Sequence, residues 1–356
     1  MRRGKYGEMV DLSWFAGKRV FITGHTGFKG VWLSFILQRA GALVTGYALP
    51  PITPFFDLIS FDRLTSEIGD IRNLESLSAA FRQARPDIVF HLAAQALVLE
   101  GYKNPALTFE TNVMGTVNLL ECVRVADWPI SAVVNVTTDK VYKNCEWDWP
   151  YRETDALNGR DPYSNSKSCS ELVTSCYRSS LVDAQIPLST ARAGNVIGGG
   201  DFADNRIIPD CIRSAMSGSE INVRNPSSVR PYQHVLEPLS AYLRLAEGTA
   251  KNPTLASAYN VGPRDSDYLT TGELASLFCQ IWGEGASWTH SEIDNPPESK
   301  LLRLDSSRIR AALGWEPRWG ISQGVKATID WTKAWLRGDN INSVMTHQIE
   351  EYFSAA

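Results

Sequence analysis

Arg19-Val20-Phe21-Ile22-Thr23-Gly24-His25-Thr26-Gly27-Phe28-Lys29-Gly30 joins a short apolar run to a segment with a helical pattern. The run predicts a β-strand, and residues 31–40, closed by Gly41, predict a helix. A glycine-rich turn between a strand and a helix lets the backbone approach a pyrophosphate, whose charge the helix start favours. The spacing is GxxGxxG rather than GxGxxG, and a tight turn without a ligand would need similar glycines. The strand-turn-helix context favours the phosphate site.

The rest of the first half alternates strand-like and helix-like segments. Predicted strands lie at 43–47, 65–68, 88–92, 132–136 and Leu188–Ala193, and predicted helices at Leu74–Ala84 and 106–126. Continuous apolar strands separated by helices are typical of a buried parallel sheet. We therefore expect an α/β fold in which residues 1–194 form a doubly wound, parallel-sheet Rossmann domain.

Beyond Asn195 the pattern of the chain changes. Gly198-Gly199-Gly200 indicates a flexible break, prolines and arginines become frequent, and we expect shorter helices in less regular alternation. Residues 195–356 are expected to form mainly a smaller C-terminal α/β lobe that binds substrate. Parts of this later chain can also return to the first domain.

Composition excludes several classes of protein. The chain has 356 residues, 44% of them hydrophobic, and a formal net charge of -4, which gives no basic footprint for nucleic acid. Its six cysteines form no CxxC pair and lie at no metal-ligand spacing, so we expect free thiols and no metal. No apolar run is long enough to cross a membrane, and the first 15 residues lack the apolar core of a signal peptide. A cytoplasmic location is expected.

Three positions bear on the predicted phosphate site. Lys29 is either a partner for phosphate or a solvated lysine on the first helical turn. No acidic residue follows Tyr47 at the end of the second strand, where an acid usually binds the adenosine ribose. Asp70, after the third strand, is either an acceptor for the adenine amine or a turn aspartate.

A second group of polar residues indicates acid–base chemistry. Tyr163 and Lys167 are four residues apart, so they share one face of a helix, and a lysine cation beside a phenol lowers the pKa of the phenol. Such a phenol is a base for a hydroxyl proton. Thr138, Asp139 and Lys140 follow an apolar strand, at the end where open α/β sheets bind ligands. An Asp-Lys pair there could equally be a surface ion pair.

Together these motifs resemble the extended short-chain dehydrogenase/reductase family. The resemblance rests on Gly24, Gly27 and Gly30, on Thr138, and on Tyr163 with Lys167, and it covers residues 14–335. His91-Leu92-Ala93-Ala94-Gln95 and Asn112-Val113-Met114-Gly115-Thr116 also match segments that line the cofactor in that family. It implies NAD as cofactor, held by Gly24, His25, Thr26, Gly27, Phe28, Lys29, Gly30, Asp70, Ile71, Leu92, Ala93, Ala94, Asn112, Tyr163 and Lys167.

Within the family, Asp139-Lys140 is similar to the branch of CDP-glucose 4,6-dehydratases, whereas dTDP-glucose 4,6-dehydratases carry Asp-Glu there. The loop around Lys29 and Gly198-Gly199-Gly200 also match the CDP-glucose branch. Leu99 stands where that branch usually has arginine, and Phe202 and Tyr232 stand where it has tryptophan. The resemblance therefore defines the sugar pocket less closely than the cofactor site.

The resemblance implies NAD-dependent dehydration of CDP-D-glucose to CDP-4-keto-6-deoxy-D-glucose. Tyr163, assisted by Lys167 and Thr138, would take the proton of the 4-hydroxyl as hydride leaves C4. Asp139 and Lys140 are the candidates for the acid at the C6 hydroxyl and the base at C5. Analogy with the Asp-Glu branch favours Lys140 as base and Asp139 as acid, and the residues alone leave that assignment open.

The resemblance also implies a substrate site and an assembly. Arg230 matches the arginine that meets the pyrophosphate, and the implied substrate-binding residues are Gln95, Asn195, Arg206, Arg230 and Glu298. The helices at 106–126 and 163–180 correspond to those that pair in family homodimers, so we expect a homodimer or a dimer of dimers. A nucleotide-sugar 4-epimerase or reductase is the nearest rival and needs no elimination pair. A non-catalytic NAD(P)-binding protein would lack Thr138, Tyr163 or Lys167.

Overall fold

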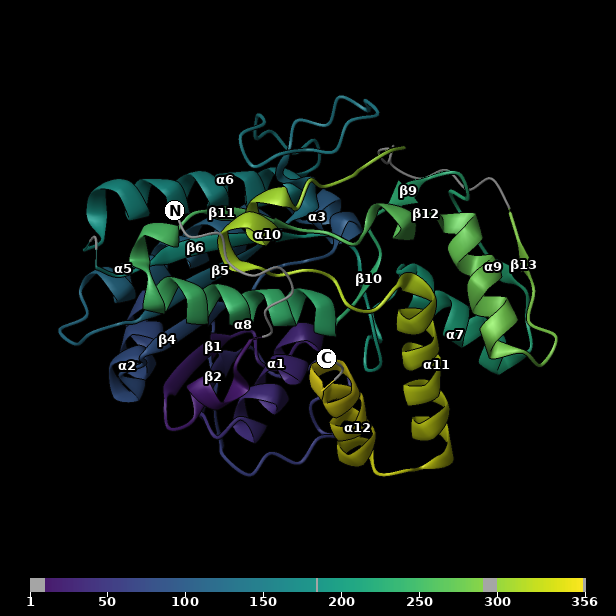
Figure 1. The fold of residues 1–356 in the computed structure, drawn as a ribbon, viewed down its shortest axis with the longest axis horizontal. Coiled ribbons are helices and arrows are strands. Elements are labelled where there is room, and N and C mark those ends of the chain that lie inside the picture. Colours follow the sequence, from purple (N-terminus) through teal and green to yellow (C-terminus); the bar gives the residue numbers. More distant parts are fainter. Residues whose placement is uncertain (1–9, 184, 291–299, 355–356) are drawn as a thin grey trace.

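A seven-stranded parallel sheet forms the centre of the first lobe (Figure 1). The computed structural model describes residues 10–183, 185–290 and 300–354. Every neighbouring pair of strands in the order β11-β6-β5-β4-β1-β2-β3 is parallel. The strands are β1 Arg19–Thr23, β2 Leu43–Ala48, β3 Leu64–Ile68, β4 Ile88–His91, β5 Ala132–Thr138, β6 Leu188–Ala193 and β11 Ala258–Val261.

The strand order reverses between β1 and β4. From β1 the chain builds outward through β2 to β3, and from β4 it builds in the other direction through β5, β6 and β11. The loops that leave the carboxyl ends of β1 and β4 therefore diverge, and ligands of doubly wound sheets bind at this point. The predicted doubly wound α/β fold is confirmed.

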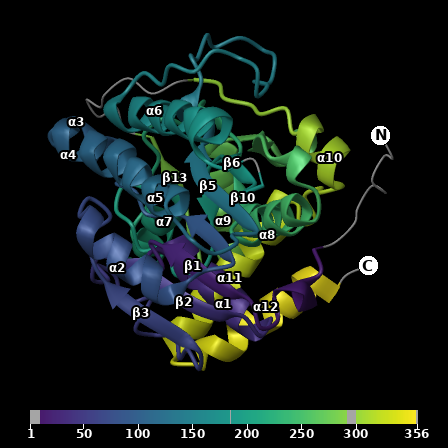
Figure 2. The same cartoon turned by 90° about the vertical axis from the view of Figure 1, so that its left-hand side faces the viewer.

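Alternating side chains bury both faces of the sheet. Val20 and Ile22 of β1 pack into one core with α1 (Phe28–Arg39) and α8 (Leu236–Lys251). Phe21 points to the opposite core, which it shares with α2 (Leu74–Ala84) and α5 (Gly115–Arg124). The view in Figure 2 shows these two groups of helices on either side of the strands. Helix α6 (Pro162–Cys176) contacts β5 and β6.

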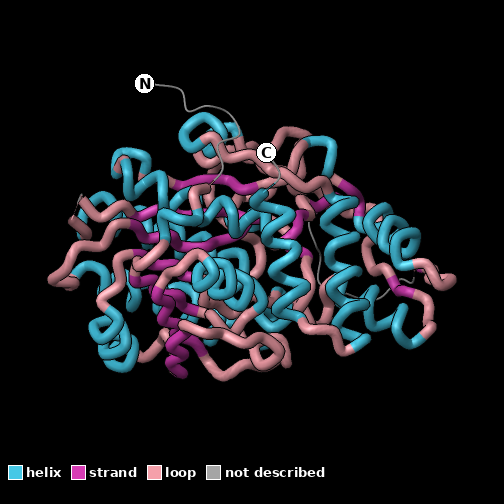
Figure 3. Tube along the Cα trace, turned by 60° about the horizontal axis from the view of Figure 1, so that its bottom comes forward, coloured by secondary structure: helices cyan, strands magenta, loops and turns pink. Residues whose placement is uncertain are grey.

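The second lobe is built from α7 (Ile207–Ser217), α9 (Thr271–Trp282) and α11 (Ile321–Arg337), around a core of its own. Its strands are two-residue pieces, whereas the long strands gather in the first lobe (Figure 3). The remaining elements are α3 Val98–Lys103, α4 Pro105–Phe109, α10 Ser307–Leu313, α12 Ile341–Ser354, β7 Val196–Ile197, β8 Ile221–Asn222, β9 Val229–Arg230, β10 Gln233–His234, β12 Leu269–Thr270 and β13 Trp288–Thr289, with the short helical turns η1 Leu12–Phe15, η2 Glu110–Met114, η3 Asp139–Val141, η4 Tyr177–Leu181, η5 Pro253–Leu255 and η6 Asp265–Asp267.

Two expectations about the helices differ from the structure. The stretch 106–126 is not one uniform helix, because the π-helical turn η2 separates α4 from α5. The helices beyond residue 195 are not all short, since α8 has 16 residues and α11 has 17. Helix α8 is long because it covers β5 and β6 of the main sheet, so part of the later chain contributes to the first lobe. The boundary of the two predicted domains stays a prediction.

The three glycines at 198–200 are buried rather than a flexible break. A Cβ on Gly199 would lie 2.0 Å from Cγ of Trp331, and one on Gly200 would lie 2.5 Å from the Phe55 ring. The indole of Trp32 also donates a hydrogen bond to the carbonyl of Gly199 (2.9 Å). Glycine is needed here for close packing, so the prediction of flexibility was wrong.

Candidate active site

The turn after β1 has the geometry of a phosphate-binding loop. Gly24 has a φ of +79°, and a Cβ there would lie 2.7 Å from the backbone nitrogen of Ala93. A Cβ on Gly30 would lie 2.1 Å from the carbonyl oxygen of Gly24. Gly27 begins helix α1 without a side-chain cap, so the amides of the first helical turn are left for another acceptor. The residues present therefore fit the pyrophosphate of a dinucleotide such as NAD.

Side chains of the same loop fix it to its surroundings. Nε2 of His25 is hydrogen bonded to the hydroxyl of Ser66 (2.7 Å), and burial lowers the pKa of His25 to about 4. Thr26 donates to the carbonyl of Leu49 (3.0 Å). Phe28, the first residue of α1, packs against the core of the first lobe. These three side chains hold the loop in place, so a bound cofactor would meet the backbone of this stretch.

Lys29 is directed toward the other site residues. Its Nζ lies 3.4 Å from the hydroxyl of Tyr242. Its pKa is lowered to about 7, first by burial and then by the positive charges of Arg206 and Lys167. The alternative of a solvated surface lysine is wrong, because burial and two other cations act on this ammonium group.

The segment after β4 runs beside the phosphate loop. The backbone nitrogen of Leu92 donates to the carbonyl of Thr23 (3.1 Å), and that of Ala93 donates to the Thr23 hydroxyl (3.2 Å). Ala94 continues the same segment and is partly exposed. The segment after β4 is therefore bonded to the end of β1, at the point where the two loops begin to diverge.

Asn112 holds this segment from the π-helical turn η2. Its Oδ1 accepts from the backbone nitrogen of Gln95 (2.8 Å), and its Nδ2 donates to the carbonyl of Gln95 and the hydroxyl of Ser166. The side chain of Gln95 donates to Thr108 (2.9 Å) and accepts from the backbone nitrogen of Leu97 (2.6 Å). Each end of the Gln95 amide makes one hydrogen bond within the protein, and each can make a second one, so the predicted contact to substrate stays a prediction.

Asp70 lies after β3, as predicted, but its carboxylate is already paired. One oxygen accepts from the backbone nitrogen of Arg72, and the other forms an ion pair of 2.6 Å with the Arg72 guanidinium. These bonds lower the pKa of Asp70. Of the two predicted alternatives, the Asp70 carboxylate in this structure acts as a turn aspartate. Ile71 beside it is buried, and its side chain would clash with a Cβ on Gly115.

The carboxyl end of β5 presents Thr138, Asp139 and Lys140. The hydroxyl of Thr138 donates to Oδ1 of Asp139 (2.9 Å), and Oδ2 of Asp139 is buried with no hydrogen-bond partner among the described residues. Burial raises the pKa of Asp139, and the nearby charges of Lys140, Arg230 and Lys29 act against that rise. The pair is therefore not a surface ion pair, because Asp139 is only 1% exposed.

Tyr163 and Lys167 lie on one face of α6 next to this strand end. Burial raises the pKa of Tyr163 to about 12, although a hydrogen bond with Thr138 lowers it. Nζ of Lys167 donates to the carbonyl of Val136 (3.1 Å), and burial lowers its pKa to about 8. The sequence predicted that Lys167 lowers the pKa of Tyr163. In the protein alone this pKa is raised instead, because burial of the phenol has the larger effect.

The second lobe contributes cations to the same place. Arg230 on β9 is 4% exposed, and its charge acts on Asp139. Arg206 begins helix α7, pairs with Asp201 (3.1 Å), and acts on both Lys29 and Tyr163. The carbonyl of Asn195 accepts from the backbone nitrogen of Gln233 (3.0 Å), which leaves its side chain for other contacts. Glu298 lies outside the described residues.

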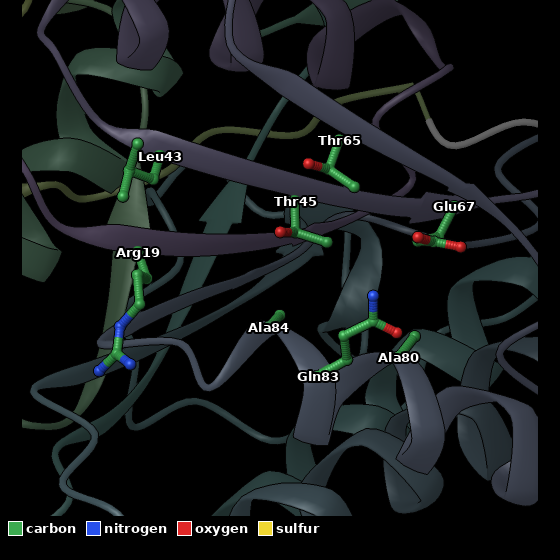
Figure 4. A pocket seen from close by; sticks show the side chains of 8 residues that line it. All are labelled: Arg19, Leu43, Thr45, Thr65, Glu67, Ala80, Gln83 and Ala84. Carbon is green, nitrogen blue, oxygen red and sulfur yellow. The ribbon is translucent and has the colours of Figure 1, made fainter.

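A separate cavity of about 230 Å³ lies on the sheet away from these residues (Figure 4). Arg19 and Leu43, which line it, are the first residues of β1 and β2, so it lies toward the ends opposite the phosphate loop. The full lining is Arg19, Leu43, Thr45, Thr65, Glu67, Ala80, Gln83 and Ala84.

The sequence analysis missed two charged residues beneath the site. Glu171 on α6 and Arg192 on β6 form a buried ion pair of 2.9 Å. Glu171 is one helical turn beyond Lys167, so the spacing alone could have indicated it. Arg192 could not be found this way, because its position depends on the pairing of β5 with β6.

The comparisons with known proteins agree with this geometry. The family model described as GDP-mannose 4,6 dehydratase matches residues 21–328. The chain is 45% identical to the CDP-glucose 4,6-dehydratase of Salmonella typhimurium, over 98% of this chain and 99% of that protein.

The chain belongs to the nucleotide-sugar 4,6-dehydratase family. Members of this family are NAD-dependent hydro-lyases that act on nucleotide sugars. Two solved structures share the fold of this dehydratase. The epimerase Mth375 of Methanothermobacter thermautotrophicus has a TM-score of 0.82 at 22% identity, over 92% of this chain and 95% of that one. The dTDP-glucose 4,6-dehydratase of Bacillus anthracis, in complex with NAD, has a TM-score of 0.75 at 20% identity, over 88% of this chain and 96% of that one.

The described part of the dehydratase lacks two kinds of feature. No helix there is both long and apolar enough to cross a membrane. Within the same residues, no group of three or more His, Cys, Asp or Glu side chains could hold a metal ion.

Proposed function

We propose that this dehydratase converts CDP-D-glucose to CDP-4-keto-6-deoxy-D-glucose. The observation that carries the choice of substrate is the 45% identity, over almost the whole of both chains, to a CDP-glucose 4,6-dehydratase. The structure supports the chemistry by bringing Thr138, Asp139, Tyr163 and Lys167 together at the carboxyl end of β5.

We propose that Tyr163 accepts the proton of the sugar 4-hydroxyl. When bound beside the loop after β1, NAD+ would supply the acceptor for the C4 hydride and the donor of the hydride that reaches C6. The pKa of about 12 means that Tyr163 is a neutral phenol in the protein alone, with the Thr138 hydroxyl hydrogen bonded to it. A positive charge near the phenol, from Lys167 and the oxidised cofactor, favours the phenolate that the proton transfer needs.

Elimination of water requires an acid at the C6 hydroxyl and a base at C5. A carboxyl whose pKa is raised by burial keeps its proton more readily, and the Oδ2 of Asp139 has no partner among the described residues. We therefore assign Asp139 the role of protonating the departing C6 hydroxyl. Lys140, the next residue, is partly exposed and is assigned the role of removing the C5 proton and of returning a proton to C5 when hydride reaches C6.

We propose that the nucleotide diphosphate binds between Lys29 of the first lobe and Arg206 and Arg230 of the second lobe. Arg230 and Lys29 both act on Asp139, Arg206 acts on Lys29 and Tyr163, and guanidinium groups suit phosphate oxygens. Asn195 and, outside the described residues, Glu298 remain candidates for further substrate contacts. Residues beyond 195, apart from α8, β11, α10 and α12, which pack on the first lobe, would then form the nucleotide-sugar lobe.

We also propose that the dehydratase works in the cytoplasm as a homodimer. Leu107 on α4, Met114 on η2 and Leu172 on α6 are large apolar side chains that are 39%, 49% and 57% exposed. Helices α4 and α6 are in contact, so these side chains can form one surface for a second copy. All six cysteines are unpaired, which fits a reducing compartment. Light scattering on the pure protein tests the assembly.

The substrate is tested by incubating the protein with NAD+ and CDP-glucose, with dTDP-, UDP- and GDP-glucose in parallel. The product is read by mass for loss of one water and by the absorbance of a 4-keto sugar in base. We expect water loss from CDP-glucose. Water loss only from another nucleotide sugar would contradict the substrate, and inversion at C4 without water loss would indicate a 4-epimerase instead.

A further inference from the structure

Glu171 is a buried carboxylate that the roles assigned above do not use. Its side chain is 3% exposed and lies on α6 one turn after Lys167. Its Oε1 accepts a hydrogen bond of 2.5 Å from the hydroxyl of Thr137. Its Oε2 accepts from the hydroxyl of Thr190 (2.8 Å) and from Arg192 (2.9 Å). The carboxylate is therefore fully engaged in one geometry.

These contacts reach the reacting groups through three successive residues of β5. The carbonyl of Val136 accepts from Lys167 (3.1 Å), and Thr137 donates to Glu171 (2.5 Å). Thr138, the third residue, carries the hydroxyl that bonds to Asp139. The end of β5 is thus tied to α6 at Lys167 and at Glu171, so a change at Glu171 would affect Lys167 and Thr138 together.

We propose that Glu171 is a positioning residue for Lys167: its hydrogen bond with Thr137 fixes the end of the strand whose Val136 carbonyl accepts from Lys167, and its buried carboxylate lies one helical turn from that lysine. This inference rests on the proposed function, in which Lys167 assists Tyr163. Glu171 does not touch the sugar or the cofactor and acts only through its neighbours. Its bond to Thr137 fixes the strand end at the same time.

The other charged groups around Lys167 oppose its positive charge or leave it unchanged. Burial lowers the pKa of Lys167 to about 8, and Glu171 is the group that raises it. Lys29 faces Lys167 from α1 as a second cation. His91 faces it from β4, and burial followed by the charge of Lys167 lowers the pKa of that histidine to about 3, so the ring is neutral. Within the described residues, Glu171 is therefore the anion that acts on the Lys167 ammonium.

A purely structural role for Glu171 makes a different prediction. Arg192 also needs a partner, because a buried guanidinium without one is costly. If Glu171 served only Arg192, its loss would lower stability without changing how the rate depends on pH. The pH profile therefore separates the two roles.

The test compares Glu171→Gln with Thr190→Val in the full-length protein. Glu171→Gln removes the charge, so Lys167 loses its proton at lower pH. We expect the alkaline limb of the profile of kcat against pH to shift to lower pH by about one unit. At a given pH on that limb the rate is then about tenfold lower, and at lower pH the variant regains the wild-type rate. Thr190→Val removes one hydrogen bond to Glu171 but no charge, so its profile should keep the wild-type limb. If Glu171→Gln does not fold, Glu171→Asp, which withdraws the charge, should give a smaller shift in the same direction.

A second readout separates this inference from the proposed function. NAD+ affinity is measured over the same pH range by quenching of tryptophan fluorescence, which requires no sugar. A wild-type protein without activity on CDP-glucose would contradict the proposed function, while a shifted pH dependence of NAD+ binding in Glu171→Gln would still support the inference. Folded Glu171 variants with wild-type pH dependence in both measurements would overturn it.

Discussion

The hydroxyl of Thr138 donates a hydrogen bond of 2.9 Å to Oδ1 of Asp139, at the point where β5 ends. The second oxygen of the same carboxylate, Oδ2, is buried and has no partner among the described residues. Buried polar atoms are rarely left in this way without a reason. Because burial also raises the pKa of Asp139, the carboxyl is suited to carry a proton that it can give to a leaving hydroxyl.

Asp139→Asn should therefore stop water loss without stopping oxidation at C4. The amide keeps the shape and the bond to Thr138, but it has no acidic proton to donate. We expect product formation to fall about 10²–10⁴-fold, the range for loss of a general acid. The absorbance of bound reduced nicotinamide should still appear on mixing with substrate. Normal product formation would remove Asp139 from the mechanism.

Lys140→Met is expected to stall the reaction one step earlier. If Lys140 is the base, the variant oxidises C4 but cannot remove the C5 proton. In D2O, substrate recovered from Lys140→Met should carry no deuterium at C5, whereas substrate recovered from Asp139→Asn should carry it. The opposite pattern would exchange the two roles and make Asp139 the base.

Tyr163→Phe should lose the first hydride transfer. The phenol is the group proposed to accept the 4-hydroxyl proton, and its loss should lower the rate of cofactor reduction about 10²–10⁴-fold. Tyr177→Phe is the matched control, because Tyr177 follows the same helix and its hydroxyl bonds to Glu121 (2.5 Å), outside the site. Rapid-mixing absorbance of the cofactor is the measurement. Equal rates of cofactor reduction in the two variants would contradict the role of Tyr163.

The sequence predicted the centre of the sheet most directly, because β1, β4 and β5 are apolar along most of their length. Strands β1 and β6 and helix α2 have the predicted bounds. Both sheet faces are buried, so the signal is a continuous apolar run and does not depend on the rest of the chain.

Features that depend on distant contacts could not be predicted. The glycines at 198–200 are needed because Trp331 and Phe55 pack on them, and nothing in the local sequence shows those rings. The raised pKa of Tyr163 likewise follows from its burial rather than from the position of Lys167. The sequence predicted which residue types form the candidate site. It could not predict their protonation states, because these depend on how deeply the packing buries each side chain.

Gly30→Ala should disturb both the fold and cofactor binding. The new methyl group would lie 2.1 Å from the carbonyl oxygen of Gly24, so the phosphate loop would have to open. We expect a loss of about 1–3 kcal/mol in stability and weaker NAD+ binding. Gly338→Ala is the control, since Gly338 has a φ of +77° with no atom within 4 Å and lies at the end of α11. It should lose stability through backbone strain alone and bind NAD+ normally, and a Gly30→Ala protein with normal affinity would contradict the loop assignment.

Glu237 should make the stability of the dehydratase depend on pH. This buried carboxylate on α8 accepts hydrogen bonds from the backbone nitrogen of Trp319 (2.6 Å) and the hydroxyl of Tyr352 (2.8 Å), so it joins α8 to α12. Burial raises its pKa to about 7. The folded chain then binds the proton more tightly than the unfolded chain, whose glutamates titrate near 4.5. The contribution of Glu237 to stability is complete below about pH 4.5 and is lost as the pH rises through about 7.

Glu237→Gln removes this titration while it keeps an oxygen that can accept from Trp319 or Tyr352. We expect the midpoint of thermal unfolding to fall less in the variant than in the wild type between about pH 5 and pH 8, because one pKa unit corresponds to about 1.4 kcal/mol. Glu350→Gln is the control, because it changes an exposed glutamate of α12 and should leave the pH dependence of the unfolding midpoint as it is. Gln348→Glu would be a poor control, since it adds a new acid. A wild type and a Glu237→Gln variant with the same dependence on pH would show that Glu237 does not titrate in this range.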